Sequence, residues 1–155
     1  MPTRPPGTPN VDLTFDDAFG DINGAVFMTG LFQLEPDHFS SFLQIKHNGI
    51  EQGYNTDGVL QQDQVDVQNS THSILLAEVP IVIGDGSHGT QEGVAYREFR
   101  LNIGEAAAGQ YLSLDSLQLW QEEAGNLTNF TSGSGFAGTH TNYLAYDLDA
   151  GGIDR

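Results

Sequence analysis

The sequence lacks cysteine and is poor in basic residues, and each absence excludes a class of function. Without cysteine, neither a disulfide nor a thiolate metal site can form. Only five residues are Lys or Arg, against 21 Asp and Glu, so the formal net charge is -16. A field of this sign repels phosphate backbones and anionic lipid. We therefore expect neither nucleic acid nor a membrane surface as a partner.

Long apolar runs are missing as well. No segment approaches the roughly 18 continuous apolar residues that a membrane span requires, so we expect no membrane insertion. The first residues, Met1 to Pro6, contain no apolar stretch of the kind that a signal peptide needs. If the protein is secreted, we expect this sequence to be the mature chain.

Glycine is abundant, with 19 of 155 residues, and short stretches alternate between apolar and polar side chains. This pattern is typical of β-proteins with many turns. We count about nine short strands. The clearest cover 11–15, 25–34, 39–45, 71–76, 80–83, 94–103, 112–119 and 144–146. The sequence predicts an all-β fold, an antiparallel β-sandwich with jelly-roll-like topology.

Three details refine the predicted strands. Asn48-Gly49 is a two-residue hairpin signal, because both residues tolerate positive φ. The apolar phase slips within 94–103, which predicts a bulge at Arg97-Glu98. Residues 125–141 are rich in Gly, Ser, Thr and Asn and predict a loop.

The N-terminus predicts a separate segment. Residues 1–10 hold four prolines and should form a stiff extended arm, whereas residues 11–155 should form a single sandwich domain. After the arm, Val11, Leu13 and Phe15 alternate with polar residues. They are either the first strand of their own domain or a strand that completes the sheet of a neighbouring subunit.

Acidic residues near the C-terminus predict a structural Ca²⁺ site. Carboxylates at alternate positions, followed by Gly151-Gly152, resemble an oxygen cage for a hard cation. The fit is partial, because no glutamate follows to close the cage. Acids near residue 20 would then complete the coordination. The candidate ligands are Asp147, Asp149, Asp154, Asp16, Asp17 and Asp21; the alternative is a solvated acidic turn.

Aromatic residues and sequons suggest contacts with sugars. Trp120 falls out of phase with Leu117 and Leu119, so it either lies under a loop or offers a platform for sugar stacking or a subunit contact. Tyr111 and Tyr54 are further stacking candidates. Three N-x-[ST] sequons begin at Asn69, Asn126 and Asn129 and predict glycosylation if the chain is secreted.

The sequence contains no motif that we assign to catalysis. Residues 84–89 match G-x-G-x-x-G, but the next regular segment reads as a strand, whereas a dinucleotide site needs a helix there. The sequence contains neither a G-x-S-x-G elbow nor an H-E-x-x-H motif, and its five histidines lack ligand spacing. A pair of carboxylates could serve a glycosidase, but we expect no enzyme.

Several motifs, spread over roughly residues 13–152, resemble a group of secreted bacterial β-sandwich proteins, some of which carry C-terminal surface-sorting tails. The segments that carry the resemblance are 42–45, 48–56, 94–99, 112–115 and 146–152. It implies an extracellular or cell-surface location and a non-enzymatic role. Members usually continue beyond the acidic glycine turn into a further strand, so we expect a closing strand to be missing here.

Two functions follow as hypotheses. The first is a bead-like structural subunit of an extracellular filament or matrix, a homopolymer that assembles through its N-terminal arm and strand with Ca²⁺ support. The second is a carbohydrate-binding or adhesive surface module that uses the aromatic platforms.

Overall fold

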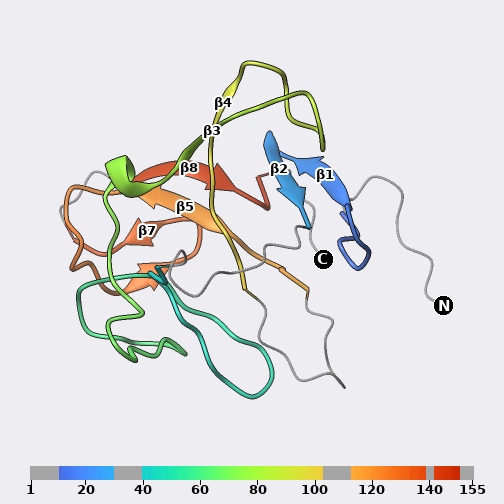
Figure 1. The fold of residues 1–155 in the computed structure, drawn as a ribbon. Coiled ribbons are helices and arrows are strands. Elements are labelled where there is room, and N and C mark those ends of the chain that lie inside the picture. The colour runs from blue at the N-terminus through green and yellow to red at the C-terminus, as the bar shows by residue number, and fades with distance from the viewer. Residues whose placement is uncertain (1–10, 30–39, 103–112, 139–141, 151–155) are drawn as a thin grey trace. The chain divides into compact units, whose positions relative to one another are not determined.

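The computed structural model describes residues 11–29, 40–102, 113–138 and 142–150, and within them the chain is mostly β and loop (Figure 1). Eight short strands form four two-stranded sheets, with strand order β1-β2, β3-β4, β5-β8 and β6-β7. The strands are β1 (Phe19–Ile22), β2 (Ala25–Met28), β3 (Ile81–Ile83), β4 (Ala95–Arg97), β5 (Gln118–Gln121), β6 (Phe130–Thr131), β7 (Gly135–Phe136) and β8 (Tyr143–Asp147). One 3₁₀ turn, η1 (Leu76–Glu78), precedes β3.

The chain divides into two compact units, and each is made of segments that are far apart in sequence. Unit 1 takes its described residues from Met1–Phe32, Pro80–Gln118 and Tyr146–Arg155. Unit 2 takes them from Gln33–Val79 and Leu119–Ala145. Unit 1 therefore contains the hairpins β1–β2 and β3–β4, and unit 2 contains β6–β7.

The hairpin β1–β2 owes its turn to Asn23-Gly24. Ile22 pairs with Ala25, so the connection has two residues, and their φ values are 52° and 83°. Positive φ at both central residues is the geometry that matches the right-handed twist of the flanking strands. Asn-Gly therefore forms a hairpin turn in this chain, but at residues 23–24. In the described residues, no paired strands flank the turn predicted at Asn48-Gly49.

The hairpin β3–β4 pairs Ile81 with Arg97 and Ile83 with Ala95. The predicted strands 80–83 and 94–103 thus contain it, although β4 ends at Arg97, where the bulge was expected. The ladder continues one residue beyond each end: Glu98 N donates to Pro80 O (3.0 Å) and Gly84 N donates to Val94 O (2.8 Å). The loop after β3 leads into a strand, which confirms that the glycine-rich motif opens no helix.

The core of unit 2 is aromatic. Tyr54, only 8% exposed, lies 5.7 Å from Phe130 and 5.3 Å from Phe136 between ring centroids. Both phenylalanines come from β6–β7, within the stretch that was predicted as a loop. Gly135 has φ of 77° and lies so close to Trp120 and Asn142 that a side chain would not fit. Aromatic contacts therefore stabilise a hairpin that the polar composition concealed.

A polar network joins three segments of unit 2. The hydroxyl of Thr56, a residue only 2% exposed, donates to Leu127 O (2.5 Å), and Asp57 N donates to Gly125 O (2.8 Å). Ser73 donates to both oxygens of the Asp57 carboxylate, through N (2.9 Å) and Oγ (2.7 Å). These hydrogen bonds from Ser73 hold the pKa of Asp57 below its ordinary value.

Some strand predictions are wrong, and the reason is side-chain competition. Residues 11–15 form no strand, because Asp12 Oδ1 accepts both the N–H (3.0 Å) and the hydroxyl (2.7 Å) of Thr14. A main-chain donor bonded in this way cannot join a ladder. Residues 71–76 form no strand either: the main-chain N–H of Thr71 donates to Asp66 Oδ1 (3.3 Å), and its hydroxyl donates to Val65 O (2.6 Å). Within 40–45 the structure shows one isolated bridge, between Ile45 and Gln64.

The prediction of an all-β, antiparallel protein is confirmed in part: the described strands are short and pair in four two-stranded sheets. The β-sandwich with jelly-roll-like order stays a prediction, as does the single domain over 11–155. The arm at residues 1–10 lies outside the described residues. No helix in the described part of the chain has the length and apolar character to cross a membrane.

Gly125 tests the polar network of unit 2. A Cβ at this position would overlap Ser73 Oγ and Asp57 Oδ2, so Gly125→Ala must separate the segments that Asp57 joins. We expect the free energy of unfolding to fall by about 1–3 kcal/mol, measured by chemical denaturation. Ala124→Ser, a change at the exposed neighbouring residue, is the control and should have little effect. Equal stability of the two variants would contradict this account of the network.

Candidate functional site

The candidate site lies in unit 1, where the turn of β1–β2 meets the end of β8. Asn23 Nδ2 donates to Asp147 O (3.1 Å) and to Leu148 O (2.8 Å). The side chain of the hairpin turn thus holds the chain where it leaves β8. Asn23 occupies the first turn position because it tolerates positive φ, and this backbone conformation leaves its amide free to bond elsewhere.

The carboxylate of Asp147 is held by two donors. Gln118 Nε2 donates to Oδ2 (3.0 Å), and Asp149 N donates to Oδ1 (2.9 Å). The second bond makes an Asx turn, in which an aspartate side chain accepts the N–H two residues on. The sequence Asp147-Leu148-Asp149 therefore forms a hydrogen-bonded acidic turn, as its alternate carboxylates suggested.

Tyr146 joins the two parts of the site. Its hydroxyl donates to Ile22 O (3.0 Å), and its ring lies 6.4 Å from that of Phe27. Partial burial raises the pKa of Tyr146, and the negative charges of Asp21 and Asp147 raise it further. Asp21 precedes Ile22 and Asp147 follows Tyr146, so the hydrogen bond between Tyr146 and Ile22 brings both carboxylates near the same side chain.

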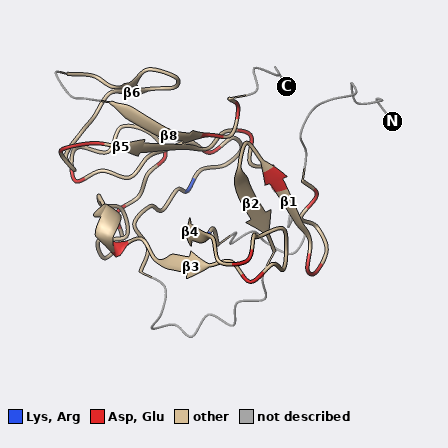
Figure 2. Ribbon diagram, turned by 90° about the horizontal axis from the view of Figure 1, so that it is seen from above, with Lys and Arg blue, Asp and Glu red and all other residues tan. Residues whose placement is uncertain are grey.

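The predicted calcium ligands are thus only partly assembled. Asp21, Asp147 and Asp149 lie around this site, whereas Asp16 and Asp17 lie in the exposed turn before β1. In Figure 2 red marks acidic residues both on β1 and in the loop that leads into it. Asp154 lies outside the described residues. Within those residues, no three Asp, Glu, His or Cys side chains gather into a group that could hold a metal. Each oxygen of Asp147 accepts one hydrogen bond from the protein, from Gln118 Nε2 or from Asp149 N, and keeps a further lone pair.

The predicted stacking platforms lie in different environments. Tyr54 is buried in the aromatic core of unit 2, and its hydroxyl donates to Gln61 (2.6 Å), so its ring has no face for a sugar. Trp120 is half-buried and packs edge-on against Phe130 at 6.1 Å. Trp120 thus contacts the 125–141 segment through Phe130, and its role as a platform stays a prediction. Tyr111 lies outside the described residues.

The three sequon asparagines are exposed. Asn69 and Asn129 have positive φ values of 60° and 55°. Asn129 Oδ1 accepts a hydrogen bond from Gln61 (3.0 Å), which fixes its amide against unit 2. Exposure is what a glycosylation acceptor needs, and glycosylation stays a prediction.

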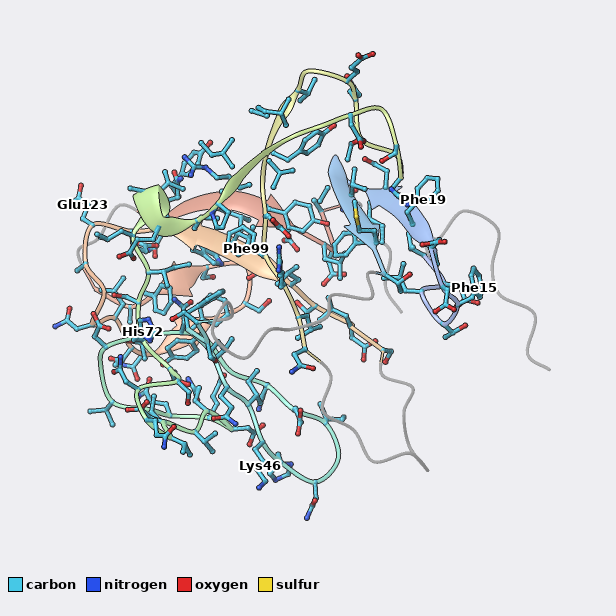
Figure 3. The ribbon with its side chains drawn as sticks, viewed as in Figure 1. Phe15, Phe19, Lys46, His72, Phe99 and Glu123 are labelled. Atoms are coloured by element: carbon cyan, nitrogen blue, oxygen red, sulfur yellow. The ribbon has the colours of Figure 1, made fainter. Side chains whose placement is uncertain are left out.

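The predicted subunit-contact residues are folded back on unit 1. Val11 lies against Gly20, whose missing side chain provides the space, and Leu13 is half-buried. Phe15 is 59% exposed, although its carbonyl accepts a bond from Thr29 Oγ1 (3.1 Å) (Figure 3). Phe15 is therefore the contact residue that the fold leaves most accessible.

Asp85, Ser87 and His88 form a polar cluster that was predicted only as part of a glycine-rich loop. Ser87 Oγ donates to Asp85 Oδ1 (2.6 Å) and lies 2.9 Å from His88 Nδ1. In a catalytic triad the histidine lies between the serine and the acid and takes the serine proton. Here the serine lies between the other two, so its proton goes to the carboxylate. The hydrogen bonds from Ser87 lower the pKa of Asp85, and the cluster serves to close a loop.

Comparisons with protein-family models, with curated proteins and with solved structures found no match.

Tyr146 gives a test of the site by pH titration. Its folded-state pKa is raised, so we expect it to ionise above about 10, the ordinary value for tyrosine. The sign follows from linkage: the stabilisation by Tyr146 is complete below the unfolded pKa and is lost as the pH rises through the folded pKa. Ultraviolet titration should show a late tyrosine ionisation that Tyr146→Phe removes.

The matched control is Tyr143→Phe, because Tyr143 is 60% exposed on the same strand. This variant should keep the late ionisation. Tyr146→Phe should also lower the free energy of unfolding by about 1 kcal/mol, since the bond to Ile22 is lost. A late ionisation that persists in Tyr146→Phe would contradict the assignment.

Proposed function

We propose that this protein is a non-enzymatic structural subunit of an extracellular filament or matrix. Copies of the chain assemble through the N-terminal segment, and Ca²⁺ at the acidic turn supports the joint. The observation that carries the proposal is the state of residues 11–15. This segment has the alternation of a strand, belongs to no sheet in the described residues, and exposes Phe15 to solvent.

Strand addition gives such a segment a function. An added strand gains main-chain hydrogen bonds from a sheet edge and places alternate side chains into the neighbouring subunit. The bonds from Thr14 to Asp12 must open first, which frees the N–H that a ladder needs. Because these residues are exposed and the turn is local, opening it costs little compared with the ladder gained.

Calcium would act by relieving repulsion. The chain carries a net charge of -16, and neighbouring copies repel one another. Oxygens are available at Asp21 and at the Asp147–Asp149 turn, which both lie near Tyr146. A divalent cation bound there lowers the local charge at the joint. Carbohydrate binding has weaker support, because Tyr54 is buried and Trp120 packs against Phe130.

Electron microscopy of the assembled protein tests the proposal. We expect filaments or matrix in purified native material, and we expect chelation of Ca²⁺ to loosen them. The variant Leu13→Ser/Phe15→Ser should give unassembled particles, because it removes two of the three apolar side chains of the segment but keeps Val11 on Gly20. Circular dichroism should show an unchanged fold.

The control Ile50→Ser removes an equally apolar side chain from a position in unit 2 that is 90% exposed. This variant should assemble as the wild type does. Normal assembly of Leu13→Ser/Phe15→Ser would refute the role of the N-terminal segment, and filaments indifferent to chelation would remove Ca²⁺ from the joint.

A further inference from the structure

The strand β3 presents a second edge that is suited to pairing. Among the strands that the structure describes, β3 pairs with β4 alone. Its three side chains are apolar and open to solvent on both faces: Ile81 is 59% exposed, Val82 44% and Ile83 59%. Natural sheets usually protect an edge with a charge, a proline or a bulge within the strand, and β3 contains none of these.

The register of the hairpin shows which main-chain groups point outward. Pro80 O and Gly84 N bond to β4. Hydrogen-bonded and non-hydrogen-bonded pairs alternate along an antiparallel ladder, so the N–H and C=O groups of Val82 also face β4. The N–H and C=O groups of Ile81 and Ile83 therefore face away from β4, toward the open edge. The edge offers two donors and two acceptors, arranged symmetrically about Val82.

We propose that β3 pairs with β3 of a second copy of this chain, antiparallel and about a two-fold axis at Val82. In this register Ile81 lies opposite Ile83 of the second copy, and each such pair exchanges both of its N–H···O=C bonds. All outward groups of the edge are then satisfied. The two hairpins become one four-stranded sheet, in which Ile81, Val82 and Ile83 of one copy lie beside the same residues of the other as cross-strand neighbours. An isologous interface of this kind closes on itself as a dimer.

The charge distribution favours a second copy at this place. Residues 80–102 hold three acidic and two basic residues, so the hairpin is nearly neutral in a chain with a net charge of -16. In contrast, residues 11–29 hold four acids and no base. Two identical acidic chains can therefore approach each other at β3 with less repulsion than at β1–β2. Salt screens the repulsion that remains, so we expect association to tighten as ionic strength rises.

This interface does not depend on the N-terminal segment, so its test is separate from that of the proposed function. The chain has no cysteine, which allows a single one to report the contact. Val82 lies opposite itself in a non-hydrogen-bonded pair, where Cα atoms are about 4.5 Å apart, a separation that a disulfide spans. Under mild oxidation, Val82→Cys should form a covalent dimer at least about tenfold faster than the control Ile50→Cys.

A second pair of variants tests the apolar edge by sedimentation over a range of protein concentrations. Ile83→Lys should raise the dimer dissociation constant by at least about tenfold. Ile50→Lys makes the same change of charge at an exposed isoleucine of unit 2 and should leave the constant unchanged. Because both substitutions reduce the net negative charge equally, a difference between them reports the edge itself.

Three outcomes would overturn the proposal. They are a wild-type chain that stays monomeric at every concentration and salt level, a Val82→Cys variant that cross-links no faster than Ile50→Cys, and a dimer lost on deletion of residues 1–15. The last result would assign the edge of β3 to the N-terminal segment of a neighbour.

Discussion

The described structure depends on hydrogen bonds from side chains to the main chain of distant segments. Few apolar side chains are fully buried, whereas Thr56, Gln64 and Thr71 are buried and bonded. The amide of Asn142 meets both N and O of Phe136, as a neighbouring strand would. In a chain with short strands and long connections, such bonds satisfy the main-chain groups that ladders leave open. Where such bonds draw two segments together, the space can be too small for a side chain, as it is at Gly125.

The sequence predicts the β class and the strands β2, β3, β4 and β8, because apolar alternation survives where no side chain competes for the main chain. It fails at 11–15, where Asp12 takes the N–H of Thr14. It also fails at β6–β7, where Phe130 and Phe136 are isolated among polar residues and gain their stability from Tyr54, a contact distant in sequence. Propensity and periodicity are local measures, and they do not register such contacts.

The candidate site was predictable in part. The acidic turn at Asp147–Asp149 follows from the spacing of its carboxylates, and its proximity to Asp21 was expected of a folded β-domain. The role of Asn23 was not predictable, because the local sequence of a turn does not indicate which distant main-chain groups its side chain will bond. The open edge of β3 was also hidden, since Ile81, Val82 and Ile83 read as an ordinary buried strand until their exposure is measured.

The bond from Tyr146 to Ile22 spans 124 residues, and those from Asn23 to the end of β8 span 124 and 125. Contacts of such long sequence separation form late, because closing a large loop costs entropy before any contact repays it. During synthesis β1–β2 leaves the ribosome early and must wait, incompletely packed, for β8. The contacts of Asn23 and Tyr146 therefore form only after the chain has been synthesised through β8, so the order of synthesis determines when this site first exists.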